Sequence, residues 1–129
     1  MSDKDKPYAA WFGAAMWLGI IADWVLGIPG IFWPNATLAL AGQPLALETP
    51  IWPAFASLLL FLISLFYIPG AIDPYRYRAT AILSVLARPP GVLFFLLLWP
   101  NHYPAFGYLD LAMFLIQAPL LYLALRHEP

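Results

Sequence analysis

Long apolar stretches alternate with short polar ones along this chain. Four stretches have the length of about 20 residues that an α-helix needs to cross the hydrocarbon core of a bilayer. They are residues 8–27, 50–69, 79–99 and 104–125. Prolines and glycines fall at or near each junction, where a missing backbone donor costs least. The pattern predicts a single transmembrane domain over residues 1–129, an all-α integral membrane four-helix bundle.

A shorter apolar run, residues 35–42, lies in the loop after the first stretch. Asn35 is a favourable N-cap residue, and Gly42 suits the position that follows a helix C-terminus. The run is too short to cross a bilayer. We therefore expect a short helix that lies along the outer interface or over the bundle.

Composition indicates which solvent surrounds the helices. Hydrophobic residues make up 63% of the chain and charged residues 10%, against roughly 45–50% and 25% in soluble domains. A chain of this size cannot hide so much apolar surface from water, so we expect the lipid bilayer to be its main contact. A net charge of −1 provides no electrostatic basis for binding nucleic acid. The absence of cysteine excludes thiolate chemistry and iron–sulfur clusters.

Lysine and arginine are distributed unevenly among the loops. Lys4 and Lys6 precede the first span, Arg76 and Arg78 lie between the second and third, and Arg126 follows the fourth. The two other loops contain neither residue type. By the positive-inside rule, both termini are expected in the cytoplasm, which makes the chain a multi-pass protein of the cell inner (plasma) membrane.

The predicted inner loop has the sequence DPYRYR, residues 73–78. Asp73 before a proline is typical of a turn. Arg76 and Arg78 alternate with tyrosines, as in an interfacial anchor. Two arginines are too few to predict a phosphate site for lipid headgroups.

Three ionisable residues fall inside the predicted spans. Asp23 lies near the outer end of the first span, and Asp110 lies one to two turns inside the outer end of the fourth. Arg88 lies roughly 13 Å from the cytoplasmic end of the third span by the helix rise. Because charge inside a membrane is costly, each of the three is a functional hypothesis.

Three arrangements are open to Arg88. It can bind backbone carbonyls that lose their donors because Pro89 and Pro90 follow. It can extend toward the cytoplasm, or it can form a buried pair with Asp23 or Asp110 that bridges helices. The helix rise separates Arg88 from Asp110 by about 10 Å in depth, which favours extension to the cytoplasm. A proton or ion path through the three residues is a further alternative, for which one small bundle offers little room.

Histidines and short motifs indicate no catalytic or metal site. His102 lies in a tight outer turn and His127 in the C-terminal tail, so the predicted membrane separates them and they cannot hold one haem. The sequence contains no Glu-x-x-His pair and no hydrolase, P-loop or dinucleotide motif. We therefore predict no catalytic and no metal-binding residue, and a non-enzyme explains the chain more readily than an enzyme.

Several polar and aromatic side chains near the outer ends of the spans suggest a ligand pocket. They are Trp33, His102, Tyr103 and Asp110. A quinone needs a hydrogen-bond donor for each carbonyl, and His102 with a neighbouring tyrosine or tryptophan can supply one. The predicted ligand is a quinone or a lipid, and no other cofactor is expected.

Residues 11–20 (WFGAAMWLGI) and 65–78 (LFYIPGAIDPYRYR) resemble segments of small four-helix bacterial inner-membrane proteins. In architecture the chain is also similar to the DoxX-like group. The likeness covers about the first three helices and carries no motif with an assigned role. It implies association with quinone-linked oxidoreductases.

Two functions are expected from these observations. The first is a non-catalytic accessory or assembly subunit of a larger membrane complex, such as a respiratory or photosynthetic one, or of a homo-oligomer. Short loops and bulky apolar faces on a small chain support it. The alternative is a quinone- or lipid-binding membrane protein associated with a quinone-linked oxidoreductase.

Overall fold

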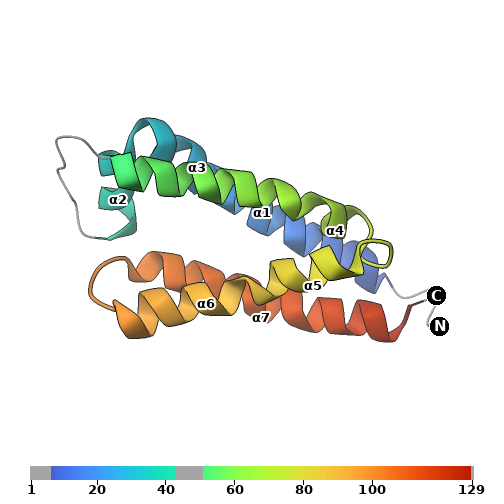
Figure 1. Ribbon diagram of the computed structural model, residues 1–129. Helices are drawn as coiled ribbons and strands as arrows, with labels where there is room; N and C mark the ends of the chain where they lie inside the picture. Colours follow the sequence, from blue (N-terminus) through green and yellow to red (C-terminus); the bar gives the residue numbers. More distant parts are fainter. Residues whose placement is uncertain (1–6, 43–50, 129) are drawn as a thin grey trace.

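The computed structural model describes residues 7–42 and 51–128, and within these ranges it contains helices and no strand (Figure 1). In chain order the elements are α1 (Tyr8–Phe32), α2 (Pro34–Ala41), α3 (Ile51–Phe66), α4 (Ile68–Ile72), α5 (Arg78–Leu86), α6 (Arg88–Leu93), the π-helical segment η2 (Phe94–Leu98) and α7 (Pro104–Arg126).

Four helical segments are long and apolar enough to cross a membrane, as the hydrophobic pattern predicts. They are Tyr8–Phe32, Ile51–Ile72, Arg78–Leu98 and Pro104–Arg126. The second and third are each assembled from shorter elements that follow one another with little interruption. The length and apolar character of all four support a multi-pass protein in a lipid bilayer. Lys4, Lys6 and Pro50, which the sequence-based topology uses, lie outside the described residues.

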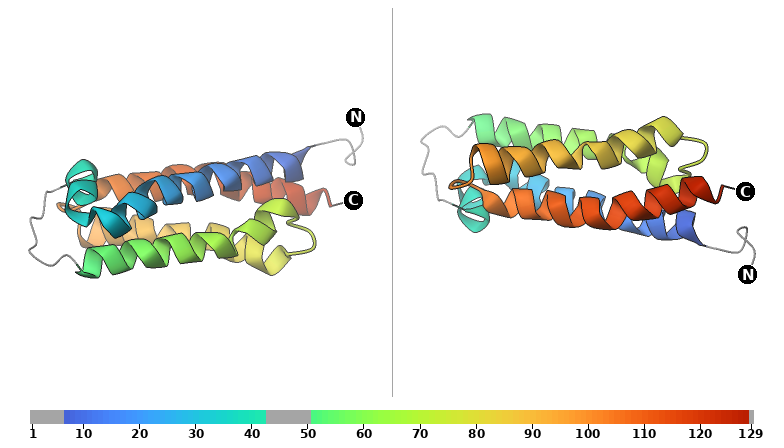
Figure 2. Two further views of the ribbon diagram at one scale, coloured as in Figure 1. Left: turned by 90° about the horizontal axis from the view of Figure 1, so that it is seen from above. Right: turned by 90° about the horizontal axis from the view of Figure 1, so that it is seen from below.

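The helices form two pairs that meet at one end of the molecule. α3 packs along α1, and α6 with η2 packs along α7 (Figures 1 and 2). α4 packs on both α1 and α5, and α1 also packs on α7. Helix α1 begins and helix α7 ends at the same end of the bundle, where the rings of Tyr8 and His127 stack with centroids 5.3 Å apart. We call this the terminal end and the opposite one the α2 end.

The first helix continues past Gly27, where the proline–glycine pattern placed its end. Pro29 and Gly30 lie inside α1, which ends at Phe32. A Cβ atom at Gly30 would overlap the Ser57 hydroxyl of α3. The absence of a side chain at Gly30 therefore allows α1 and α3 to approach closely. This packing keeps the segment helical, although a proline followed by a glycine often ends a helix.

Prolines at two other junctions also lie within helices. Pro69, predicted to end the second span, lies in the first turn of α4, and the span continues to Ile72. Pro89 and Pro90 lie in the first turn of α6. The first turn of a helix tolerates proline because its amide groups have no intrahelical acceptor.

The short apolar run after α1 is helical over Pro34–Ala41. Trp33, not Asn35, occupies the N-cap position, because Pro34 already takes the first helical position. Gly42 is the C-cap residue. Helix α2 packs against α1, α3 and α7 at the α2 end of the bundle.

The packed apolar core occupies the half of the bundle nearer the terminal end. Phe12, Met16 and Ile20 of α1 are almost completely buried there. They join a cluster with Tyr67, Ala71, Ala81, Val85 and Leu121 from the other helices. Nearer the α2 end, the buried charged residues Asp23 of α1 and Arg88 of α6 lie beside Asp110 of α7, and these three residues form the candidate site.

Candidate functional site

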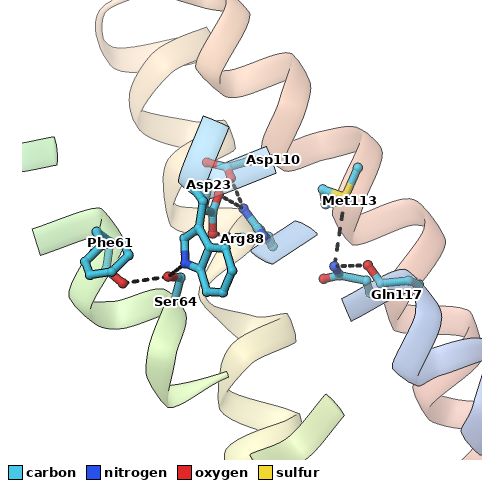
Figure 3. A network of polar contacts seen from close by, with 9 residues as sticks. Asp23, Phe61, Ser64, Arg88, Asp110, Met113 and Gln117 are labelled. Atoms are coloured by element: carbon cyan, nitrogen blue, oxygen red, sulfur yellow. Dashed lines mark hydrogen bonds and ion pairs between the residues drawn. The ribbon is translucent and has the colours of Figure 1, made fainter. Parts of the chain in front are cut away.

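Arg88 at the start of α6 forms a buried ion-pair cluster with Asp23 of α1 and Asp110 of α7 (Figure 3). Its Nη1 atom lies 2.9 Å from Asp110 Oδ1 and 3.4 Å from Asp23 Oδ1. Its Nη2 atom lies 3.5 Å from Asp23 Oδ2. Arg88 is 5% exposed and Asp23 2%. Three of the four spans are therefore joined by charge-assisted contacts within the bundle.

The expectation that Arg88 extends to the cytoplasm is wrong. The third span ends at Leu98 and the fourth begins at Pro104, on the two sides of the turn that precedes α7. Arg88 lies ten residues before Leu98, and Asp110 lies six residues after Pro104. The two Cα atoms therefore differ in depth by about 6 Å at the rise of an α-helix. The long arginine stem covers that distance. Within the described residues the Arg88 guanidinium contacts the two carboxylates. It does not bind the backbone carbonyls that lose their donors because of Pro89 and Pro90.

Two glycines make room for this cluster. A Cβ atom at Gly19 of α1 would lie 2.8 Å from Arg88 Nη2 and 2.8 Å from Gln117 Nε2. A Cβ atom at Gly91 of α6 would overlap Asp110 Oδ2. Small residues thus let polar side chains lie directly against neighbouring helices, which is a common arrangement inside membrane bundles.

Two further hydrogen bonds between helices lie near the cluster, one on its terminal side and one beside it. Gln117 is fully buried, and its Nε2 donates to Ala15 O at 3.2 Å. The Trp24 indole donates to the Ser64 hydroxyl at 2.7 Å, which ties α1 to α3. The Arg88 guanidinium carbon lies 6.0 Å from the centre of the Tyr67 ring, within cation–π range. Figure 3 shows the hydrogen bonds of Gln117 and Ser64 beside the charged cluster.

On its other side the cluster borders a cavity of about 460 Å³ between the two helix pairs at the α2 end. The polar side chains in its walls are those of Asp23, Thr37, Ser57, Tyr103 and Asp110. Its apolar walls include Leu26, Leu38, Trp52, Leu60, Phe95 and Phe106. Pockets for small molecules commonly have 300–1,000 Å³ and mostly apolar walls with a few polar groups. The cavity has the size and chemistry of a ligand site.

The structure brings together two of the four residues proposed from the sequence to line a pocket. Tyr103 and Asp110 both line the large cavity. Trp33 is 66% exposed and contacts Phe32, and it does not line that cavity. His102 packs edge-on against Trp99 and borders a smaller hollow of about 260 Å³.

The Tyr103 hydroxyl is buried and has no hydrogen-bond partner among the described residues. Burial raises the pKa of the Tyr103 phenol, which keeps its proton. A buried hydroxyl without a partner costs free energy, and a polar group on an occupant of the cavity would remove that cost.

Asp73, Arg76 and Arg78 lie far from this site, at the terminal end of the bundle. Asp73 Oδ1 accepts hydrogen bonds from the Tyr75 and Arg76 amides at 3.1 and 3.2 Å. Arg78 forms an ion pair with Glu128, and the Arg76 guanidinium lies 5.3 Å from the Tyr77 ring centre. This loop is a turn with exposed charged contacts.

Sequence reasoning missed most of the cavity walls. Thr37 and Leu38 enter from α2, Leu60 from α3 and Phe95 from η2. Nothing in the sequence distinguishes Leu60 or Phe95 from the many apolar residues that face outward. Across the described ranges, no three His, Cys, Asp or Glu side chains are grouped in a way that would hold a metal ion.

Comparison of the chain with protein-family models, with curated proteins and with solved structures finds no match.

Proposed function

We propose that this protein binds one amphiphilic small molecule, a lipid or a quinone, within the membrane. The cavity of about 460 Å³ beside the Asp23–Arg88–Asp110 cluster is the observation that carries the proposal. Its apolar walls suit an acyl or isoprenoid chain, and its few polar side chains can bind the polar group of a ligand. The Tyr103 hydroxyl can donate a hydrogen bond to the polar end of the ligand, and Asp110 can accept one.

Cavity filling tests this proposal. We expect Ala56→Trp, in the cavity wall on α3, to reduce severalfold the amount of lipid or quinone that remains bound after purification in mild detergent, because the indole would occupy the binding volume. Solvent extraction and mass spectrometry measure the bound molecule. Ala14→Trp is the matched control, since Ala14 is exposed on α1 and outside the cavity. Equal ligand content in both variants would contradict the proposal.

We also propose that both termini lie in the cytoplasm and that α2 and the cavity lie at the outer side of the inner membrane. Among the described basic residues, Arg76, Arg78 and Arg126 gather at the terminal end. The positive-inside rule assigns that end to the cytoplasm. Helix α2, too short to span, would then cover the outer end of the bundle.

Reporter fusions test this orientation. Alkaline phosphatase, which is active only outside the cytoplasm, should be active when fused after Asn101 in the turn before α7. It should be inactive when fused after Tyr77. Comparable expression of the two fusions is the control, and the reverse pattern of activity would refute the orientation.

The role of an accessory or assembly subunit stays a prediction from the sequence. Bulky apolar side chains such as Phe66, Leu97 and Leu98 are strongly exposed. Acyl chains and a protein partner would cover them equally well, so these faces do not favour a complex over a bilayer. Association with a quinone-linked oxidoreductase likewise rests on the sequence resemblance, and purification in mild detergent would detect either partner.

A further inference from the structure

The buried cluster is electrically unbalanced. One guanidinium faces two carboxylates, so the three groups carry a net charge of −1 when all are ionised. An uncompensated charge in a low-dielectric interior is costly, and buried charges are normally paired. A proton on one carboxylate or a cationic occupant of the cavity would supply the missing positive charge.

Among the residues that the structure describes, no other lysine or arginine is placed to supply it. The sequence has no lysine or arginine from Pro7 to Tyr75 and none from Pro89 to Leu125. Arg76, Arg78 and Arg126 lie at the terminal end, beyond the packed core. His102 packs against Trp99 and does not line the cavity.

The excess negative charge is presented to the cavity. The Asp110 side chain is 20% exposed and the Asp23 side chain 3%, and both line the cavity. Trp52, Phe95, Tyr103 and Phe106 are also in the cavity walls. Aromatic faces attract cations, most strongly where water is excluded. Carboxylates with aromatic neighbours in an apolar cavity favour a positively charged group over a neutral carbonyl.

We propose that the occupant of the cavity is a hydrophobic monocation, a molecule with an amine or quaternary ammonium group on an apolar body. The inference rests on the proposed function and narrows its ligand class. The positive group lies beside Asp110 and balances the cluster, and the apolar body contacts the Leu and Phe side chains of the walls. A neutral quinone or an uncharged lipid is the competing outcome of the test.

Two probes of matched size and opposite charge test the proposal directly. Tetraphenylphosphonium and tetraphenylborate have the same shape, and they carry +1 and −1. We expect the protein in uncharged lipid nanodiscs to bind the cation at least tenfold more tightly than the anion, as measured by equilibrium dialysis after subtraction of the binding to empty nanodiscs of the same lipid. Equal affinity for the two ions, or failure to bind the cation, would overturn the inference.

Neutral substitutions test whether the cluster provides the charge. Asp110→Asn and Asp23→Asn each leave one guanidinium with one carboxylate, and each should weaken cation binding about tenfold or more. Glu128→Gln makes the same charge change at the terminal end, where Glu128 pairs with exposed Arg78, and should leave the affinity unchanged. Circular dichroism and gel filtration establish that each variant is folded. Unchanged affinity in both aspartate variants would refute the assignment.

Protons should compete with the cation. Asp23 of α1 and Asp110 of α7 face the Arg88 guanidinium of α6. The other titratable groups nearby are Tyr67, between α3 and α4 and within cation–π range of Arg88, and Tyr103 in the cavity wall. Protonation of either carboxylate removes the charge that attracts the cation. The affinity for tetraphenylphosphonium should therefore fall as the pH is lowered, and Asp110→Asn should abolish or greatly reduce that dependence. An affinity independent of pH in the wild type would contradict the proposal.

The two proposals can fail separately. If Ala56→Trp removes a bound neutral lipid or quinone and the wild type binds no cation, the cavity is a ligand site and the cationic class is wrong. If Ala56→Trp changes neither the bound lipid nor cation binding, both proposals are wrong.

Discussion

Replacing Arg88 by methionine is expected to lower the free energy of unfolding by about 3–5 kcal/mol, because it leaves two carboxylates in the bundle without their counter-charge. Arg88 is 5% exposed and contacts both Asp23 and Asp110. Thermal unfolding in detergent, followed by circular dichroism, measures the loss. Arg78→Met is the matched control, since its ion pair with Glu128 is exposed and such pairs contribute about 1 kcal/mol or less.

Removing the partners as well should restore much of the lost stability. The triple variant Arg88→Met with Asp23→Asn and Asp110→Asn has no buried charge in the cluster, so it should be clearly more stable than Arg88→Met alone. The three changes are then strongly non-additive, as expected for groups in one network. Additive losses would indicate that the charges do not interact as the geometry implies.

Adding a side chain at Gly70 should produce the second large loss of stability. The Gly70 backbone in α4 lies against α5, and a Cβ atom there would lie 2.8 Å from both Ala81 N and Ala81 Cα. Backbone atoms cannot turn aside as a flexible side chain can. Gly70→Val should therefore cost about 1–3 kcal/mol through overpacking, although valine has the higher intrinsic helix propensity.

The same thermal measurement applies to this variant. Ala79→Val introduces the same side chain at an exposed position of α5 and should change stability by less than about 0.5 kcal/mol. If both variants unfold at the wild-type temperature, then α4 and α5 do not pack as closely as the structure indicates.

The hydrophobic pattern by itself determined the number of spans and their approximate positions. Apolar length is a property of the sequence alone, and a bilayer requires each span to satisfy its own backbone hydrogen bonds. For the same reason the three intramembrane charges could be identified before any fold was known. The helix ends near Pro29 and Pro69 were misplaced, because contacts with other helices and first-turn positions decide whether a proline ends a helix.

The tertiary structure decided what the charged residues do. Whether Arg88 reaches Asp23 and Asp110 depends on the relative depth and rotation of three helices, and no pattern within one helix specifies either. The cavity was equally hidden, because Leu60 and Phe95 have the same apolar character as residues that face lipid. In a membrane the interior and exterior of a bundle are both apolar, so hydrophobicity predicts which segments are helices and only packing decides which faces meet.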